Sequence, residues 1–561
     1  MELESLVSKL PRHLRRYIVD QDYSRYTPID QAVWRYIMRR LTNFLSDHAH
    51  PAYMEGLNKT GIEVDRIPDI ARMNDFLKKF GWQALPVSGF IPPAAFMELQ
   101  SLSILPIASD MRTVDHILYT PAPDIVHEAA GHAPILVDPK FASYLKKYSQ
   151  VAKKAIISSE DLELYEAIRE LSDIKESPES TKEQIKNAEK HLEKVSANMT
   201  HVSEAGLLGR MNWWTAEYGL IGDLNHPKIF GAGLLSSVGE AKECLDPKIK
   251  KIPLTVDCID YSYNITEPQP QLFVTPTFEN LEKALEDLAN TMAFRTGGVA
   301  GLERALQAKT INTTEFSTGL QVSGVLTKIY NRRDSHQPDY LSFTGPCTLS
   351  HRNKIIKGHG LDRHPEGFGS PVGKIVDLIK FHVGQRRVVE FPSGVKVDGV
   401  ISNIFHQDGR VLIVTFQNCT VTYGNEVLFE PSWGEYDMAV GDRIVSVFGG
   451  PADHSSFDDT KDFPVKVIPR RKFSIGELAL HSLYTRVREI RENNLEAEKE
   501  LSEILAGVKS NFPNEWLIVL EIYELTKSQD SLEVLQEIAK KFPDKKEQIE
   551  SGIEIAEKKK I

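Results

Sequence analysis

The spacing of apolar residues changes twice along the chain, so different parts of the protein must fold differently. Up to about residue 300 apolar side chains recur at helical spacing, as in residues 28–47, and this spacing predicts amphipathic helices. Between residues 374 and 448 short β-branched runs follow one another closely, which predicts strands separated by turns. Helical spacing returns over residues 474–561. A chain of 561 residues can hold several domains of this kind.

These patterns predict a mainly α-helical domain in residues 1–320 and a small all-β domain in residues 374–470, followed by a helical region in residues 471–561. The short spacing of the strands favours a small barrel or sandwich. Residues 336–373 are rich in Gly, Pro, His and Asp, and the stretch between the two domains, residues 321–373, is predicted to be an irregular linker. Glu and Lys dominate residues 151–203, which we expect to form a charged helical hairpin inserted into the first domain.

Composition excludes several classes of protein. The formal net charge of -11 argues against a general nucleic-acid binder. The chain contains no run of eighteen apolar residues, so no membrane span is expected. The N-terminal residues show no secretory signal. The four cysteines have no close spacing, so they predict neither a disulfide framework nor a zinc or redox motif. We expect a cytoplasmic protein with neither nucleic-acid nor membrane partners.

The most specific short motif is HEAAGH, at residues 127–132. It has one residue more between its histidines than the zinc-protease motif HExxH. Residues five apart lie about 140° apart on an ideal α-helix, so His127 and His132 cannot share an ion on one straight helix. We therefore expect Gly131 to end the helix in a left-handed conformation that turns His132 back. Asp124, one turn earlier, is expected to accept a proton from the ring nitrogen of His127 that faces away from the metal.

Two imidazoles need a third ligand, and the local pattern leaves its identity open. A carboxylate would complete the facial triad of ferrous iron enzymes, which keeps three positions open. A zinc site would accept a histidine or a glutamate, and two unrelated histidines at a helix end are the remaining alternative. A similar choice arises at His336, His351, His359 and His364, where a histidine-rich linker is favoured over a second metal site.

Residues 119–144 (YTPAPDIVHEAAGHAPILVDPKFASY) closely resemble the iron site of the pterin-dependent aromatic amino acid hydroxylases. Further blocks resemble that family in the same order: 86–96 (PVSGFIPPAAF), 213–220 (WWTAEYGL), 230–240 (FGAGLLSSVGE) and 263–273 (YNITEPQPQLF). The resemblance covers roughly residues 25–300 apart from the charged insertion. It implies that residues 1–320 form a mainly α catalytic domain of that family, followed by the all-β domain and the helical region, which it does not cover.

The resemblance also implies a set of site residues. His127, His132 and Glu217 would be the iron ligands, and Arg112 would bind the substrate carboxylate through its guanidinium fork. The amino-acid pocket would be lined by Tyr119, Thr120, Pro123, Trp213, Tyr218, Gly233 and Ser236. The pterin would meet Val87, Gly89, Ile91, Phe96 and, through water, Glu128, while Tyr263 would lie near both iron and pterin and Asp124 would support the iron ligands.

The implied activity is ring hydroxylation of an aromatic amino acid. Phenylalanine is the favoured substrate, with O2 and tetrahydropterin as cosubstrates, Fe(II) as cofactor and an iron(IV)-oxo species as the oxidant. Tyrosine or tryptophan as the substrate stays open. A zinc hydrolase with Glu128 as base is a less favoured alternative. Three departures from the family pattern, at Pro93, Ala122 and Asn212, remove no metal ligand.

Overall fold

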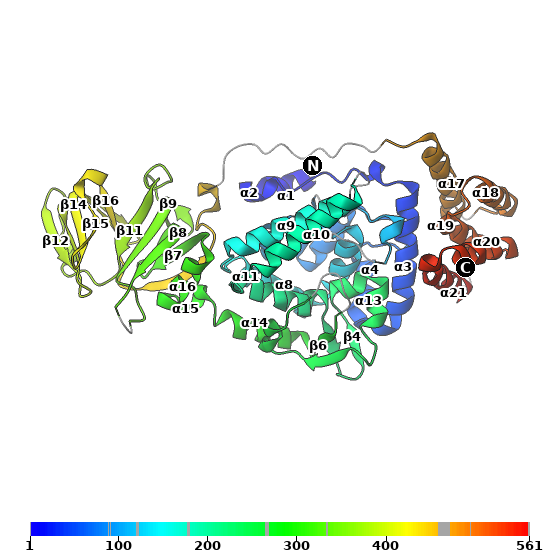
Figure 1. Ribbon diagram of the computed structural model, residues 1–561, viewed down its shortest axis with the longest axis horizontal. Coiled ribbons are helices and arrows are strands. Elements are labelled where there is room, and N and C mark those ends of the chain that lie inside the picture. Colours follow the sequence, from blue (N-terminus) through cyan, green and yellow to red (C-terminus); the bar gives the residue numbers. More distant parts are fainter. Residues whose placement is uncertain are drawn as a thin grey trace.

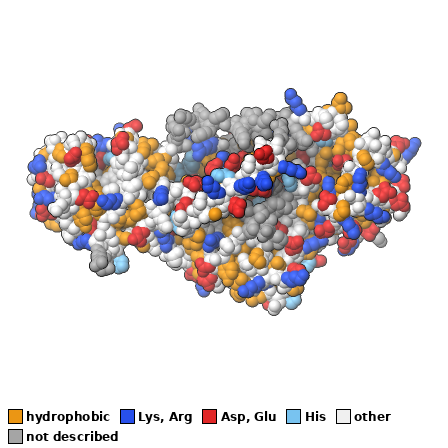
Figure 2. Space-filling view, in the orientation of Figure 1, with side chains coloured by type: hydrophobic (Ala, Val, Ile, Leu, Met, Phe, Trp, Pro, Cys, Tyr) orange, Lys and Arg blue, Asp and Glu red, His pale blue; other side chains and the backbone are white. Residues whose placement is uncertain are grey.

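The computed structural model describes residues 2–87, 89, 91–118, 123–176, 180–263, 269–332, 335–457, 472–493 and 495–558. A central helical body lies between a β-rich part at one end and a group of C-terminal helices at the other (Figure 1). Acidic and basic side chains are interspersed over both ends on the face shown in Figure 2. Within the described residues, every helix is too short or too polar to cross a bilayer.

The helical body is organised around α3 (Pro28–His48), the long helix predicted over residues 28–47. Its start is fixed by a capping box: Asp30 N–H donates to Thr27 Oγ1 at 3.1 Å, and Thr27 N–H donates to the Asp30 carboxylate at 2.7 Å. This arrangement satisfies two backbone donors that a helix start leaves unpaired. The apolar face of α3 is buried in the largest core of the molecule.

The segments around the HEAAGH motif come from several short elements of this body. Strands β1 (Gln83–Val87) and β2 (Ile104–Ala108) are parallel and joined by α6 (Pro93–Ser101). Further along the chain, α8 (Pro139–Ala152) and α11 (Glu204–Asn212) lead to α12 (Ala232–Ser236). The predicted insertion is a pair of helices packed on each other, α9 (Ser159–Glu176) and α10 (Lys182–Ala197).

The β-rich part contains two sheets and begins earlier than predicted. Its first sheet has the order β10-β9-β8-β7-β17, with β11 paired to β9, and its second has the order β12-β13-β14-β15, with β16 paired to β14. The strands of the first sheet are β7 (Ile311–Phe316), β8 (Leu320–Tyr330), β9 (Tyr340–His351), β10 (Lys354–Ile355), β11 (Gly367–Pro371) and β17 (Ile444–Gly449). Those of the second are β12 (Arg386–Glu390), β13 (Val395–Gln407), β14 (Arg410–Tyr423), β15 (Glu426–Phe429) and β16 (Tyr436–Ala439).

The prediction of an irregular linker over residues 321–373 is therefore wrong, since β8 to β11 lie in it. Some inward-facing positions of these strands are occupied by polar residues, so the strands are difficult to recognise in the sequence. Thr313 and Ser323, for example, are fully buried and their hydroxyl oxygens lie 2.9 Å apart. A strand with hydrogen-bonded hydroxyls facing inward does not alternate between apolar and polar residues, which is the pattern that identifies a half-buried strand.

The C-terminal helices pack on α3, on the side of the body away from the β-rich part (Figure 1). They are α17 (Ile475–Glu492), α18 (Glu498–Asn511), α19 (Trp516–Thr526), α20 (Gln529–Lys541) and α21 (Lys546–Lys558). Helix α19 is buried along almost its whole length. Its apolar residues join those of α3 in one continuous core.

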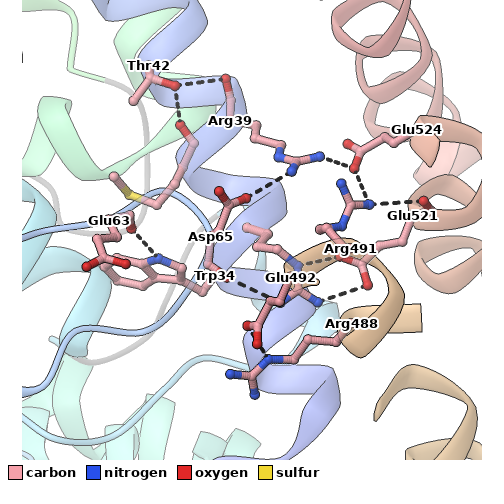
Figure 3. Close-up of polar contacts among 12 residues, drawn as sticks. Trp34, Arg39, Thr42, Glu63, Asp65, Arg488, Arg491, Glu492, Glu521 and Glu524 are labelled. Carbon is pink, nitrogen blue, oxygen red and sulfur yellow. Dashed lines mark hydrogen bonds and ion pairs between the residues drawn. The ribbon is translucent and has the colours of Figure 1, made fainter. Parts of the chain in front are cut away.

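Buried ion pairs cross this contact. The Arg35 guanidinium donates to both carboxylate oxygens of Glu521, at 2.5 and 2.9 Å, and the two side chains are only 2% and 4% exposed. Figure 3 shows Arg39 of α3 and Arg491 of α17 both directed at Glu524 of α19. Charges buried in this way must remain paired. The ion pairs therefore determine which residues of α3 face which residues of the C-terminal helices.

Candidate metal centre and its cavity

His127 and His132 lie in a π-helical segment, Val126–His132, which continues directly into α7 (Ala133–Ile135). A π-turn links residues five apart, so side chains at positions i and i+5 lie on one face. The two Nε2 atoms are 3.2 Å apart. The widened turn, and not a helix end, brings the two histidines together.

The predicted left-handed conformation of Gly131 is wrong, because Gly131 is not among the residues with positive φ and the helix continues beyond it. Glycine is required here by a close approach of α12. A Cβ atom on Gly131 would lie 2.6 Å from the carbonyl oxygen of Ala232, a distance that no carbon atom tolerates. The absence of a side chain allows the histidine-bearing segment to pack directly on the helix that carries Ser236.

Glu217 ends a second π-helical segment, Trp213–Glu217, that follows α11. Its Oε2 atom lies 3.4 Å from His127 Nε2 and its Oε1 atom lies 3.3 Å from His132 Nε2. The amide of Asn212 donates to Oε1 at 3.4 Å. Two imidazole nitrogens and the two oxygens of one carboxylate, from two widened helical turns, therefore face one another.

The donor set fits a divalent metal ion. For metal–ligand bonds of about 2.1 Å, neighbouring ligand atoms of one ion stand roughly 3.0–3.4 Å apart. The two histidine nitrogens are 3.2 Å apart, and each lies 3.3 or 3.4 Å from one of the two oxygens of Glu217. Two imidazoles and one carboxylate are the facial triad of non-haem Fe(II) sites. His127 and Glu217 also line a cavity, so the remaining positions of an ion would face that cavity.

The tautomer of His127 is set by Ser236. His127 Nδ1 lies 3.1 Å from Ser236 Oγ, and this hydroxyl donates its own hydrogen to Ala232 O at 2.7 Å. Ser236 must therefore accept from Nδ1–H, which leaves the lone pair of His127 Nε2 directed at the metal position. Burial lowers the pKa of His127 to about 4, which keeps the ring neutral.

Asp124 does not contact the His127 ring, contrary to the prediction. It accepts from the backbone N–H of His127 at 3.1 Å, and from Nε and Nη2 of Arg112, both at 2.7 Å. Burial raises the pKa of Asp124 but the Arg112 guanidinium lowers it, with a net decrease. Asp124 is thus an ionised anchor for Arg112, and Ser236 has the role that was expected of Asp124.

The other two candidate ligands, His132 and Glu217, shift each other's pKa. Burial lowers the pKa of His132 and the Glu217 carboxylate raises it, to about 9. Burial likewise raises the pKa of Glu217, while the two histidines lower it to about 2. A positive charge on His132 and the negative charge on Glu217 therefore stabilise each other. A divalent cation held by these residues would stabilise the Glu217 carboxylate in the same way and would require a neutral His132.

A cavity of about 550 Å³ opens beside the ligands. It brings together most of the residues predicted for the amino-acid pocket, namely Arg112, Pro123, Trp213, Tyr218, Gly233 and Ser236, together with Tyr263. The Trp213 ring is stacked between Tyr218, at 4.4 Å between centroids, and Tyr263, at 4.3 Å. Tyr119 and Thr120 lie outside the described residues.

The residues predicted for the pterin are not brought together with the cavity. Val87 and Ile91 are buried in a small separate core, against which Phe96 packs, and neither they nor Gly89 line the cavity. Glu128 is 5% exposed and does not line it either. Burial raises the pKa of Glu128 to about 8. From α6 the cavity is lined instead by Pro93, Ala94 and Met97.

The β-rich part also contributes residues to the cavity, and none of them was predicted from the sequence. Gly449, Gly450 and His454 line it. The His454 ring stacks on His13 at 4.7 Å, and His13 Nε2 lies 2.7 Å from the Glu98 carboxylate. These three polar residues come from segments far apart in the sequence, and no local pattern joins them.

Comparison with known proteins identifies a family that the first part of the chain resembles. Residues 17–164 and 191–297 match the model of the biopterin-dependent aromatic amino acid hydroxylase family, and the gap falls within the α9–α10 hairpin. The phenylalanine-4-hydroxylase of Mesorhizobium japonicum is 29% identical over 274 residues, which are 48% of this chain and 83% of the relative. That of Chromobacterium violaceum is 27% identical over 285 residues, 48% of this chain and 81% of the relative.

A crystal structure of the Chromobacterium violaceum enzyme with iron(III) and 7,8-dihydrobiopterin is 26% identical, covers 49% of this chain and 85% of that chain, and has a TM-score of 0.39. The protein described here is an oxidoreductase with a predominantly helical catalytic body. The matched residues, 17–164 and 191–297, belong to the biopterin-dependent aromatic amino acid hydroxylase family. The β-rich part and the C-terminal helices lie outside the residues that the family model matches.

Proposed function

We propose that the protein hydroxylates the ring of phenylalanine to give tyrosine, with O2 and tetrahydropterin as cosubstrates. Fe(II) would be held by His127, His132 and Glu217. The observation that carries the proposal is the convergence of these three side chains, whose facing nitrogen and oxygen atoms lie 3.2–3.4 Å apart, beside a cavity that His127 and Glu217 line. The relatives named phenylalanine-4-hydroxylase favour phenylalanine among the aromatic amino acids.

Bound iron and the reduced pterin would supply the redox chemistry that activates O2. The chain's own residues prepare the site for this. Ser236 holds His127 in the tautomer that binds metal, and Glu217 supplies one negative charge. Only three ligands come from the protein, so coordination positions remain for exchangeable molecules on the cavity side.

Arg112 is the residue best placed to bind the carboxylate of the amino acid. Asp124 occupies Nε and one N–H of Nη2, so the other N–H groups of the guanidinium stay available to a ligand. Arg112 also lines the cavity. The stacked rings of Trp213 and Tyr218 form a flat apolar wall in the same cavity, which suits face or edge contact with an aromatic side chain.

The environment of Glu128 disfavours the alternative of a zinc hydrolase, although a Glu128 oxygen lies within 4.8 Å of a ring nitrogen of each histidine. A hydrolytic base must be ionised and must reach the attacking water. Glu128 is buried, its Oε2 atom has no hydrogen-bond partner among the described residues, and burial raises its pKa to about 8. It also does not line the cavity.

The test supplies phenylalanine, tyrosine and tryptophan separately to the full chain with Fe(II), tetrahydropterin and oxygen-18 gas. We expect tyrosine from phenylalanine, carrying one oxygen-18 atom. Glu217→Gln should abolish the reaction, whereas Glu243→Gln, an exposed carboxylate on α13 (Val238–Glu243), should leave it unchanged. Hydroxylation of tryptophan or tyrosine alone would overturn the substrate assignment. Zinc-dependent peptidase activity without hydroxylation would overturn the class of reaction.

A further inference from the structure

A second group of histidines lies buried in the β-rich part. His359 and His364, in the segment between β10 and β11, both face Asp437 of β16. His359 Nδ1 lies 3.7 Å and His364 Nε2 lies 3.5 Å from Asp437 Oδ2. The histidine side chains are each 9% exposed and the Asp437 side chain is fully buried. None of the three residues lines the cavity described above.

The ring nitrogens that face Asp437 have no hydrogen-bond partner. His359 Nδ1 and His364 Nε2 are both buried and unsatisfied within the described residues, and their distances to the carboxylate are too long for hydrogen bonds. Buried polar atoms are otherwise almost always satisfied. Each ring therefore turns an unsatisfied nitrogen toward the carboxylate of Asp437.

The carboxylate of Asp437 is oriented and kept ionised by its neighbours, as a metal ligand must be. Arg363 donates to both oxygens of Asp437, at 2.8 and 3.2 Å, and Thr415 Oγ1 donates to Oδ1 at 2.6 Å. Such contacts orient a ligating carboxylate and keep it ionised. Arg363 also pairs with Glu435 at 3.0 Å. One arginine therefore faces two carboxylates, so an excess of carboxylate charge lies beside the two imidazoles.

The separations suit an ion between the three side chains. Zinc bonds to histidine nitrogen and carboxylate oxygen of about 2.0–2.1 Å place tetrahedral ligand atoms roughly 3.3–3.4 Å apart. The two measured distances, 3.5 and 3.7 Å, need to shorten only slightly. The three ligand atoms all lie within 4.8 Å of one another.

We propose that His359, His364 and Asp437 bind a divalent transition-metal ion, with Zn²⁺ as the ion that fits best, at a site distinct from the metal centre of the helical body. Two imidazoles and a carboxylate are ligands that zinc accepts, and a water molecule would complete the tetrahedron. The histidines precede β11, which pairs with β9 of the first sheet, whereas β16 pairs with β14 of the second. The ion would link the two sheets.

The test must separate this site from the metal centre in the helical body. We therefore use the full chain carrying His127→Gln and His132→Gln, strip it with a chelator, load it with Zn²⁺, dialyse it and measure zinc per chain by mass spectrometry. One zinc per chain is expected. Adding His359→Gln and His364→Gln should reduce the count to zero, and Zn²⁺ should raise the melting temperature only while these two histidines are present.

His351→Gln is the matched control, because His351 is equally buried in the adjacent strand β9 and lies outside the cluster. It should keep the full zinc count. Asp437→Asn preserves side-chain shape, and we expect it to weaken zinc binding at least tenfold. The proposal would be overturned if the protein carrying His127→Gln and His132→Gln bound no zinc. It would also be overturned if His351→Gln lost as much zinc as His364→Gln. Circular dichroism of each variant verifies that the protein is folded.

Discussion

The Nε2 atoms of His127 and His132 lie 3.2 Å apart although the residues are five positions apart on a continuous helical segment. An α-helix would direct them about 140° apart. The π-helical turn places both side chains on the same side of the helix instead. The close approach of Gly131 to Ala232 packs this widened turn against α12. The metal centre therefore depends on a backbone contact outside its own ligands.

Gly131→Ala tests this dependence. The new methyl group would lie 2.6 Å from Ala232 O, so α12 must move and Ser236 must move with it. Overpacking of this kind costs about 1–3 kcal/mol. We expect Fe(II) affinity and hydroxylation to fall more than tenfold, measured by iron titration and product formation. Gly239→Ala on α13 is the control, because its Cβ meets no atom within 4 Å. Equal effects of the two changes would contradict this account.

Ser236→Ala removes the acceptor of His127 Nδ1–H. Loss of such a support to a metal-bound histidine typically weakens metal affinity by about 10–100-fold, and we expect a loss in that range. The fold should be retained, because the change leaves a small gap only. Ser237→Ala is the control: it removes a helix cap on α13 and should lower the melting temperature slightly without changing iron affinity.

Asp124→Asn weakens the ionic anchor of Arg112. Hydrogen bonds to charged groups contribute about 1.5–3 kcal/mol, and a misplaced guanidinium would bind the amino acid less well. We expect KM for phenylalanine to rise about tenfold or more, with a smaller change in kcat. Asp115→Asn, which alters an exposed carboxylate paired with Lys545, should change neither constant. A fall in kcat at unchanged KM would show that Asp124 acts on the metal ligands and not on Arg112.

Glu521→Gln breaks the buried pair with Arg35. Removing one partner of such a pair costs about 3–5 kcal/mol, so the free energy of unfolding at pH 7 should fall by that amount in a denaturant titration. Glu500→Gln breaks the exposed pair with Arg486 and should cost about 1 kcal/mol or less.

The same pair predicts how stability depends on pH. Burial raises the pKa of Glu521, but Arg35 and Arg491 lower it, with a net decrease. A carboxyl whose folded pKa lies below its unfolded value of about 4.3 stabilises the protein above that value and loses this contribution as pH falls through the folded pKa. The difference in stability between wild type and Glu521→Gln should therefore be constant from pH 7 to about pH 5 and shrink in more acidic solution. A constant difference down to pH 3 would contradict the predicted pKa shift.

The histidine pair could be identified from the sequence, and Glu217 from the family resemblance. The π-helical backbone that brings the three side chains together could not be predicted from either. A π-turn is one extra residue accommodated by tertiary packing, and helix propensities do not record it. Ser236 was expected to touch the substrate, and its bond to His127 depends on the approach of α12, which only the fold shows. The strands of residues 321–373 were missed because buried hydroxyls such as Ser323 interrupt the apolar pattern.

The helical character of residues 471–561 was predicted, whereas the surface that these helices cover was not. Arg35 lies among apolar residues on α3, and its partner Glu521 is 486 positions away. No local spacing connects two such residues.

The distance in sequence between Arg35 and Glu521 also constrains how the protein can be made. Synthesis on the ribosome is vectorial, and α3 emerges long before the segment that covers it. Contacts between such distant residues slow the search for the native state. Until α19 arrives, the face of α3 that carries Arg35 stays open to solvent and to other chains. The polypeptide can thus assemble the surroundings of its catalytic centre early, yet it reaches full stability only when a much later segment closes over one of its first helices.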